Sequence, residues 1–250
     1  MRRALKIAGR LLLLAVVGLL VAFYRPDLSL ETLKARYANA DSKFLKIGDL
    51  SVHYRDVGPR DAPVLVLLHG ANASLHTWQG WSDRLKDQFR VISLDLRGHG
   101  GSEWPEDARY DFEALVEDLR AVLSQMGTRP VVVASTLGGW IASAALERDA
   151  AVLASGLVLV DSPVHVDLQV AQRVGERLRE AATLAPGQAQ WDVRLFDTHD
   201  TSAMADRLDG VAAKIALPTL YVRGAISELV TKDAAAAFVA QLPDGELVEV

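Results

Sequence analysis

Two hydroxyl-bearing residues, Ser135 and Thr136, stand between an apolar run and two glycines in the segment VVVASTLGG at 131–139. A hydroxyl held at a sharp turn between a strand and a helix can attack a carbonyl carbon, because the turn exposes the side chain. Such a turn closes only where the residues two before and two after the nucleophile are small. Ala134 and Gly138 flank Thr136 in this way, whereas Ser135 would have larger, branched neighbours. The spacing therefore favours Thr136 as the nucleophile, with Ser135 as the alternative in a shifted register.

Threonine is an unusual residue for this turn, which requires a positive φ angle. A β-branched residue in that conformation carries strain of about 1–3 kcal/mol, and its methyl group crowds the space that a substrate carbonyl must enter. Two interpretations of Thr136 follow. Either it is a working nucleophile, or the turn persists as scaffold while the nucleophile has been lost.

The elements that must position this turn are short apolar runs alternating with amphipathic stretches. We expect strands at 44–47, 51–56, 64–69, 90–95, 131–134, 156–161, 219–223 and 246–250, and helices at 81–89, 112–126, 137–146 and 232–242. This alternation predicts an α/β fold, a mostly parallel sheet with helices on both faces. No strong strand occurs between 163 and 217. Helical pieces at 168–184 and 202–215 predict a small helical lid there.

In an open parallel sheet, ligands bind at the carboxyl ends of the strands. Three short segments follow predicted strands in order: HG at 69–70, DLRGHGGS at 95–102 and ASTLGG at 134–139. In this order they resemble the α/β-hydrolase superfamily, and the resemblance runs from about Phe44 to Val250. It implies an α/β-hydrolase fold that hydrolyses a small ester, thioester or similar acyl compound. It implies no cofactor and no metal.

The resemblance also implies roles for single residues. The nucleophile position carries Thr136, where the family has Ser, Asp or Cys. The backbone N–H groups of Ala71 and Leu137 would form the oxyanion hole. The acid would be Glu228, in the loop after the seventh strand, with Asp161 at the end of the sixth strand as the alternative.

Two other polar residues that follow strands are expected to be structural. His69 should stabilise the turn after its strand rather than act as a catalyst. Asp95 should hold the loop that contains Arg97 and Gly98 in shape. Neither is therefore expected to take part in the chemistry.

The catalytic histidine that the resemblance implies has no clear counterpart, because none of the six histidines lies beyond Glu228. In the family this histidine follows the eighth strand, and the sequence reaches Val250 within that strand. His165 and His199 lie in the predicted lid, where surface positions are expected for both. We therefore expect either a C-terminally truncated piece of a longer protein, with an impaired enzyme, or a degenerate member that acts as a non-catalytic binding or scaffold protein.

Composition excludes several function classes. The 250 residues are 50% apolar, carry a net charge of -5 and include no cysteine. This excludes a disordered chain, a disulfide framework and a cysteine nucleophile, and it argues against nucleic-acid binding because no basic stripe is present. No HExxH motif suggests a metal, and the GHGG segment at 98–101 lacks the Lys of a phosphate loop. The sequence leaves the substrate and the oligomeric state open.

An uncharged apolar run, Leu11–Tyr24, follows a basic N-terminus. As a helix it spans roughly 21 Å, short of a bilayer core of about 30 Å, but extension back to Ala4 suffices if Lys6 and Arg10 snorkel. No cleavage site of small residues follows, which favours an uncleaved signal anchor over a cleaved signal peptide or a buried helix.

The basic residues before the run predict a single pass through a bacterial inner membrane, with the body on the periplasmic or extracellular side. The membrane is thus an expected partner through this segment, and the anchor resembles that of a subgroup of bacterial membrane-anchored α/β-hydrolases. The expected organisation is an anchor at 1–25, a juxtamembrane linker at 26–43 and a hydrolase domain at 44–250. The lid insertion lies at about 163–217.

Overall fold

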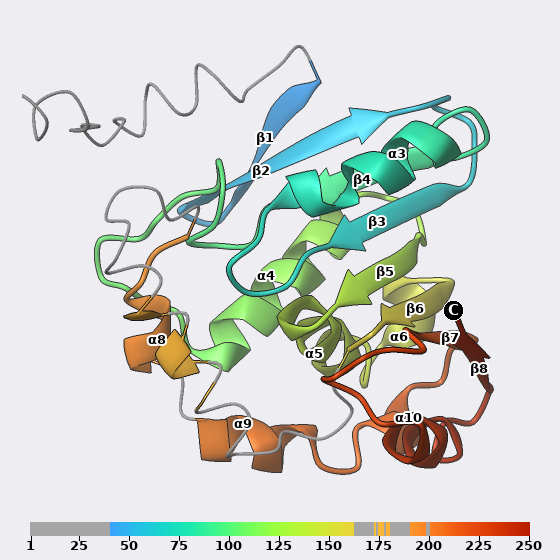
Figure 1. The fold of residues 1–250 in the computed structure, drawn as a ribbon. Coiled ribbons are helices and arrows are strands. Elements are labelled where there is room, and N and C mark those ends of the chain that lie inside the picture. The colour runs from blue at the N-terminus through green and yellow to red at the C-terminus, as the bar shows by residue number, and fades with distance from the viewer. Residues whose placement is uncertain (1–40, 163–172, 174, 178, 181–190, 199–200) are drawn as a thin grey trace, which may run out of the picture.

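A computed structural model of the chain describes residues 41–162, 173, 175–177, 179–180, 191–198 and 201–250 (Figure 1). In this part of the chain, eight strands form one sheet in the order β1-β2-β4-β3-β5-β6-β7-β8. Strand β2 is antiparallel to both of its neighbours, and all pairs from β4 to β8 are parallel. The expected α/β architecture is therefore confirmed. The strands are β1 (Ser42–Ile47), β2 (Leu50–Val57), β3 (Val64–Leu68), β4 (Arg90–Leu94), β5 (Val131–Ser135), β6 (Gly156–Val160), β7 (Thr219–Arg223) and β8 (Gly245–Glu249).

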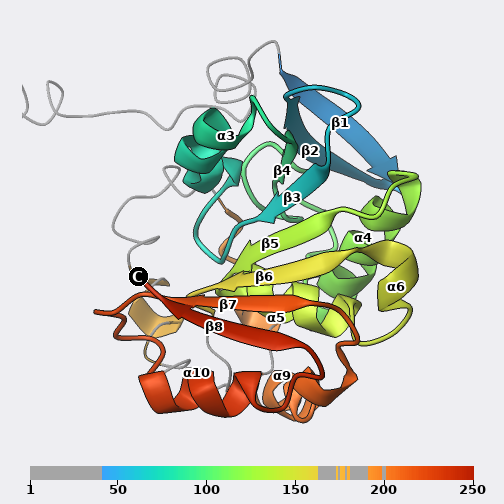
Figure 2. The ribbon, with the colours of Figure 1, turned by 90° about the vertical axis from the view of Figure 1, so that its right-hand side faces the viewer.

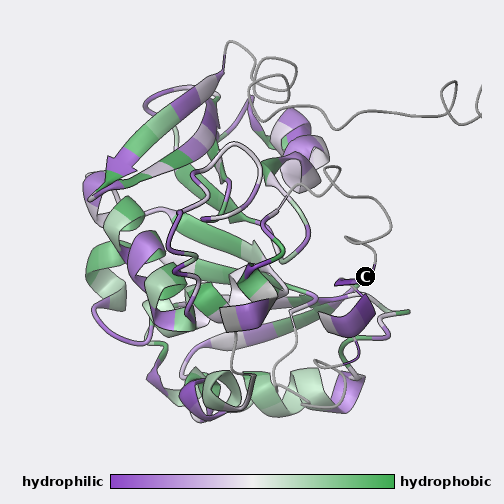
Figure 3. Ribbon diagram, turned by 90° about the vertical axis from the view of Figure 1, so that its left-hand side faces the viewer, coloured by the Kyte–Doolittle hydropathy of each residue, from purple (hydrophilic) through white to green (hydrophobic). Residues whose placement is uncertain are grey.

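Alternate residues of the central strands enter two cores. Val66 and Leu68 of β3 belong to a large cluster with helices α4 (Phe112–Gln125), α5 (Leu137–Ala145) and α10 (Lys232–Val239), whereas Leu65 and Leu67 belong to a smaller cluster with Trp78. Side chains of a strand alternate between faces, so these clusters lie on opposite sides of the sheet. Figure 3 shows the central strands as largely hydrophobic, and Figure 2 shows α10 alongside β7 and β8.

The described helical elements connect the strands. They are η1 (Leu75–Trp78), α3 (Gln79–Leu85), α4 (Phe112–Gln125), α5 (Leu137–Ala145), α6 (Ala150–Leu153), α8 (Leu195–Thr198), α9 (Thr201–Leu208), η2 (Ala212–Lys214) and α10 (Lys232–Val239). Helix α4 begins where Asp111 caps it, its carboxylate accepting the backbone N–H of Ala114 at 3.0 Å. The apolar stripe predicted for this helix is buried, which confirms that its periodicity is helical.

Several element boundaries differ from the sequence prediction. Helix α3 begins at Gln79 and ends at Leu85, earlier than the predicted 81–89, because the chain after Leu85 closes into turns whose N–H groups return to Ser82 and Leu85. Short η1 and α6 were not predicted, since four residues carry too little periodicity to detect. Strand β1 begins at Ser42, inside the predicted linker 26–43.

Two sequence predictions concern residues that the structure does not describe. The expected anchor at 1–25 lies wholly outside the described residues, as does most of the expected lid helix at 168–184. Within the described residues, no helix combines the length and the apolar character needed to cross a bilayer.

Candidate functional site

Thr136 forms the turn between β5 and α5. Its φ and ψ angles are 47° and -120°, and α5 begins at the next residue, Leu137. The carbonyl of Thr136 accepts the N–H groups of Gly139 and Trp140 at 3.0 and 3.2 Å, which starts the helix. The predicted positive φ is confirmed. By contrast, Ser135 is still part of β5, is paired with Val160 and has no positive φ.

The glycines around this turn are required by close backbone approach. A Cβ at Gly138 would lie 2.4 Å from the carbonyl oxygen of His69 and 2.8 Å from that of Leu68. A Cβ at Gly70 would lie 1.6 Å from Thr136 Oγ1. The small flank at Gly138 that the sequence indicated is therefore needed for β5 and α5 to meet at the end of β3. The Thr136 hydroxyl lies against the loop that follows β3.

The strand register brings a second strained residue to the same edge. Ser135 pairs with Val160, and Val160 pairs with Val222, so Thr136 and Asp161 follow at the same level on adjacent strands. Asp161 has a φ of 45°, and its N–H donates to the Val222 carbonyl at 2.8 Å. Strained residues cluster at functional sites when the surrounding structure holds them there. The carboxyl ends of β5 and β6 therefore form the candidate site.

The Asp161 carboxylate organises the loop after β7. Its Oδ1 accepts the Gly224 N–H at 3.2 Å, and its Oδ2 accepts the Ser227 hydroxyl at 2.7 Å. The Ser227 oxygen in turn accepts the N–H of Val230 at 3.2 Å. Glu228 belongs to the same loop but is exposed, and among the described residues it has no hydrogen-bond or ion-pair partner. Asp161 is thus held in place, whereas Glu228 is not.

A buried hydroxyl that sequence reasoning missed ties the turn to the sheet. Ser162 donates its hydroxyl to the Thr136 carbonyl at 2.9 Å, and the Tyr221 hydroxyl donates to the Ser162 carbonyl. A Cβ at Gly139 would lie 2.0 Å from Ser162 Oγ, so this glycine makes room for the contact. Burial and the nearby Asp161 carboxylate raise the pKa of Tyr221 above its usual range, so it remains a donor. No spacing in the sequence indicated this chain of bonds.

His69 is structural, as the sequence predicted. It is fully buried, its Nδ1–H donates to the Gly70 carbonyl at 2.7 Å and its Nε2 accepts the Leu96 N–H at 3.1 Å. The backbone amide can only donate, which fixes Nε2 as the acceptor and the imidazole as neutral. Burial lowers the pKa of His69, which agrees with this state.

Asp95 also has the structural role expected of it. Its Oδ1 accepts the Leu75 N–H at 2.7 Å, and its Oδ2 accepts the Gly101 N–H at 2.9 Å and the His53 Nδ1–H at 2.7 Å. Burial alone would raise the pKa of this carboxyl, but the His53 bond and the two backbone donors lower it. The ionised carboxylate holds the loop after β4 to the loop after β3.

No described histidine forms a hydrogen bond with the Thr136 hydroxyl, which has no partner among the described residues. His53 and His69 are bound to Asp95 and Gly70, and His99 Nδ1 lies 3.0 Å from the Arg97 carbonyl. The two lid histidines, His165 and His199, lie outside the described residues.

The N–H groups expected to form the oxyanion hole are available. Neither Ala71 nor Leu137 donates a backbone hydrogen bond within the part of the chain that the structure describes. Ala71 follows Gly70, whose Cα is next to the Thr136 hydroxyl, and Leu137 is the first residue of α5. Both N–H groups therefore belong to the loops that meet at Thr136.

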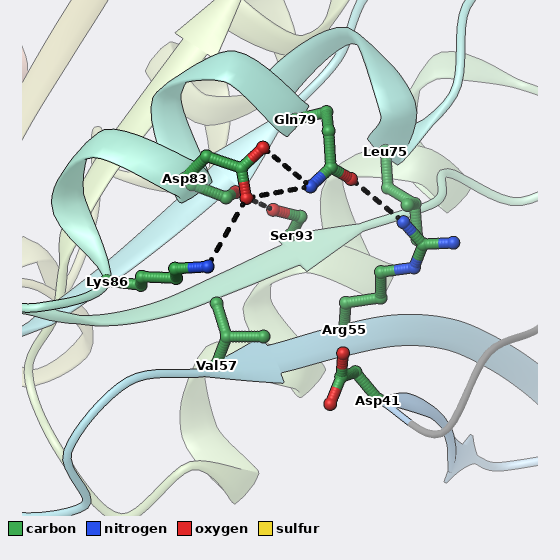
Figure 4. Close-up of a pocket in the computed structure, with 9 residues that line it drawn as sticks. Asp41, Arg55, Val57, Leu75, Gln79, Asp83, Lys86 and Ser93 are labelled. Carbon is green, nitrogen blue, oxygen red and sulfur yellow. Dashed lines mark hydrogen bonds and ion pairs between the residues drawn. The ribbon is translucent and has the colours of Figure 1, made fainter.

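A small cavity of about 80 Å³ lies elsewhere, between β2, β4 and α3 (Figure 4). Its polar residues bind one another: Gln79 contacts Asp83 and Arg55, and Lys86 lies 3.6 Å from Asp83. None of the candidate catalytic residues lines it. Among the described residues, no group of three or more His, Asp or Glu side chains could hold a metal ion.

Comparison with known proteins bears on the family and the fold. The model of the Alpha/beta hydrolase family matches residues 65–247. Epoxide hydrolase 4 of Mus musculus is 33% identical over 100 residues, 39% of this chain and 28% of that protein. A bifunctional esterase/perhydrolase of Acinetobacter calcoaceticus is 38% identical over 96 residues, 37% of this chain and 34% of that protein. The matches thus span about a third of these relatives.

Solved structures support the fold. The crystal structure of an enol-lactonase from Burkholderia xenovorans superposes with a TM-score of 0.68 at 20% identity, covering 83% of this chain and 91% of that one. At this identity the likeness concerns the fold alone. It confirms the predicted sheet with its covering helices.

Proposed function

Because the chain belongs to the α/β-hydrolase family, we propose that it hydrolyses an ester or a related acyl compound through the turn at Thr136. The observation that carries this proposal is the conformation of Thr136, with its positive φ and its hydroxyl against Gly70. Epoxide and dehalogenase chemistry on this fold needs a carboxylate nucleophile, which Thr136 does not supply. The name of the Acinetobacter relative, an esterase, fits the acyl reaction.

In the proposed reaction, Thr136 Oγ1 attacks the substrate carbonyl carbon while a base takes its proton. The resulting oxyanion receives hydrogen bonds from the N–H groups of Ala71 and Leu137. Collapse expels the alcohol, which takes a proton from the protonated base, and leaves an acyl ester on Thr136. Water then attacks this ester with the same base, and the acid is released.

No described histidine forms a hydrogen bond with the Thr136 hydroxyl, and His165 and His199 are expected at the surface, so added imidazole would act as the base. The carboxylate that orients it is Asp161, because its position at the end of β6 is fixed by Gly224 and Ser227. Glu228, which the sequence favoured as the acid, becomes the alternative in this proposal. A carboxylate with fixed partners holds an imidazole ring in one orientation better than an exposed one does.

The second candidate function is binding without catalysis. It is favoured by two features of Thr136: its hydroxyl has no partner among the described residues, and its side chain carries a methyl group that a serine at this turn would lack. In this case the fold retains its site as a binding or scaffold surface.

We also propose that residues 1–25 anchor the chain in a bacterial inner membrane, that the linker ends where β1 begins at Ser42, and that the rest of the chain forms the exported body with a lid at about 163–217. The support is the basic residues before the apolar run Leu11–Tyr24 and the missing cleavage site after it. Anchoring would bring the site to substrates at the membrane surface.

The test uses the purified full chain and its Thr136→Ala variant with p-nitrophenyl acyl esters, with and without added imidazole as an external base. We expect little turnover by the chain alone, since a hydroxyl without a positioned base is a poor nucleophile. Imidazole should restore turnover in the wild type beyond that in Thr136→Ala. Equal rates for the two proteins under all conditions would reject the acyl hydrolase in favour of the binding function.

A further inference from the structure

A short segment beyond the predicted lid helix lies against the candidate site. Trp191 is 2% exposed and forms an isolated β-bridge with His99, in the loop after β4. Its indole N–H donates to the side-chain oxygen of Asn72, 119 residues earlier in the chain. One residue of the insertion thus contacts the loop after β4 and the loop after β3, which lies against Thr136.

Asn72 is part of the loop that would supply half of the oxyanion hole. It directly follows Ala71, and its backbone has a positive φ of 54°. Its side chain is therefore placed by a turn whose conformation also decides where the Ala71 N–H points. The indole of Trp191 is the side-chain donor that this asparagine meets in the described structure.

Trp191 is itself fixed by its neighbour Asp192. The Asp192 N–H donates to the Gly98 carbonyl at 2.7 Å, and its carboxylate accepts the Tyr110 hydroxyl at 2.7 Å and the Arg194 guanidinium at 2.6 Å. Arg194 also donates to the carbonyl of Pro105 at 3.0 Å. Asp192 is 5% exposed. These bonds fix the segment that carries the indole to the rest of the protein. The indole can therefore restrain the loop that contains Asn72.

We propose that Trp191 is a positioning residue, which holds the Ala71 N–H in line with the Leu137 N–H through its bond to Asn72. This inference rests on the proposed acyl hydrolysis. An oxyanion hole stabilises the transition state only if its donors are already in place. A displacement of a catalytic group by about 1 Å can lower the rate about 100-fold. The insertion would therefore affect the rate of the reaction as well as the access of substrate to the site.

The experiment compares three variants of the full chain with imidazole present. Trp191→Phe removes the donor and keeps a ring in the buried position. Asn72→Gly removes the acceptor and tolerates the positive φ, whereas Asn72→Asp keeps an acceptor oxygen. Trp81→Phe is the matched control, because Trp81 is 38% exposed and packs on Trp78 away from this bond.

Two quantities are measured: the part of the ester turnover that Thr136→Ala abolishes, and the amide ¹⁵N–¹H shift of Ala71. Trp191→Phe and Asn72→Gly should each lower kcat by about 10- to 100-fold with KM little changed, and both should move the Ala71 signal. Asn72→Asp should retain most of the kcat, and Trp81→Phe should change neither quantity.

An unmoved Ala71 signal in Trp191→Phe would overturn the inference whatever the rate. A shifted Ala71 signal with an unchanged kcat would overturn it as well, since the bond between Trp191 and Asn72 would then have no effect on the reaction. If no turnover depends on Thr136, the proposed function fails instead, and the Ala71 signal alone decides whether Trp191 positions the loop.

Discussion

The hydroxyl of Thr136 occupies the space where a side chain at Gly70 would have to be, since a Cβ at Gly70 would lie 1.6 Å from Thr136 Oγ1. The turn after β5 and the loop after β3 therefore pack closely only because residue 70 has no side chain where the Thr136 hydroxyl lies. The effect on stability of a substitution at Gly70 should therefore depend on the side chain at position 136.

Gly70→Ala should lower the free energy of unfolding by about 1–3 kcal/mol through overpacking. Adding Thr136→Gly should restore most of this loss, because it removes both the clash and the strain of a β-branched residue at positive φ. Gly138→Ala is the control, since its Cβ would meet the backbone carbonyl of His69 at 2.4 Å and cannot be relieved at Thr136. Urea unfolding gives these energies for Gly70→Ala and Gly138→Ala, each with and without Thr136→Gly, and equal rescue of both alanine variants would contradict the geometry.

Thr136→Ser should raise the ester turnover in the presence of imidazole, counted as the part that Thr136→Ala abolishes. It keeps the hydroxyl and removes the methyl group that crowds the substrate, and it should also relieve part of a strain of about 1–3 kcal/mol. Ser135→Ala should have a small effect, because Ser135 still belongs to β5. Initial rates and melting temperatures check both. If Ser135→Ala abolishes turnover while Thr136→Ser leaves it unchanged, Ser135 is the nucleophile.

Asp161→Asn should reduce the imidazole-supported, Thr136-dependent turnover by about 10-fold or more, because an amide no longer stabilises the imidazolium that carries the proton. The amide oxygen can still accept the Gly224 N–H, so the loop should keep its shape. Glu228→Gln should have a much smaller effect, since that side chain is exposed and lacks a partner among the described residues. The measurement is kcat for both variants of the full chain. A larger loss in Glu228→Gln would assign the acid to Glu228.

His69 should make the stability fall as the pH drops below about 6.5. Burial lowers its pKa below the ordinary value of 6.5, so the unfolded chain takes up a proton there that the folded chain does not. The free energy of unfolding therefore decreases from about pH 6.5 toward pH 5, above the range in which carboxylates titrate.

Replacing His69 by Gln keeps an acceptor for Leu96 but cannot be protonated. This variant should be less stable at neutral pH and should lose less stability between about pH 7 and pH 5 than the wild type, measured by urea unfolding. His76→Gln is the comparison, because the pKa of His76 is also lowered, by partial burial and by the nearby Arg55 guanidinium, although the residue is exposed by surface area. Parallel pH profiles for His69→Gln and the wild type would show that another group titrates.

The full chain should remain with bacterial membranes after a carbonate wash, and protease added to spheroplasts should digest its body. Both expectations follow from the apolar run Leu11–Tyr24 and the basic residues before it. A chain lacking residues 1–25 is the control and should be released. Extraction of the full chain by carbonate, or complete protection of its body, would reject the anchor and its orientation.

The sequence by itself determined the α/β alternation and the register of the turn at Thr136. Both depend on neighbours within a few residues. Apolar runs mark buried parallel strands, and Ala134 and Gly138 are the small flanks without which the turn cannot close. The structural roles of His69 and Asp95 were also predictable, because each directly follows a strand and bonds the loop that begins there.

Only the tertiary structure decided which groups surround that turn. Ser162 bonds to the Thr136 carbonyl, and Tyr221 bonds to Ser162, because three parallel strands align their ends, which no local spacing reveals. The contact between Trp191 and Asn72 joins residues 119 positions apart through the path of an insertion. Hydrogen bonds from the loop after β7 fix the Asp161 carboxylate, whereas Glu228 in that same loop is exposed. Hydrogen bonds between distant segments depend on how the whole chain packs, and a sequence pattern records only what lies within a few residues.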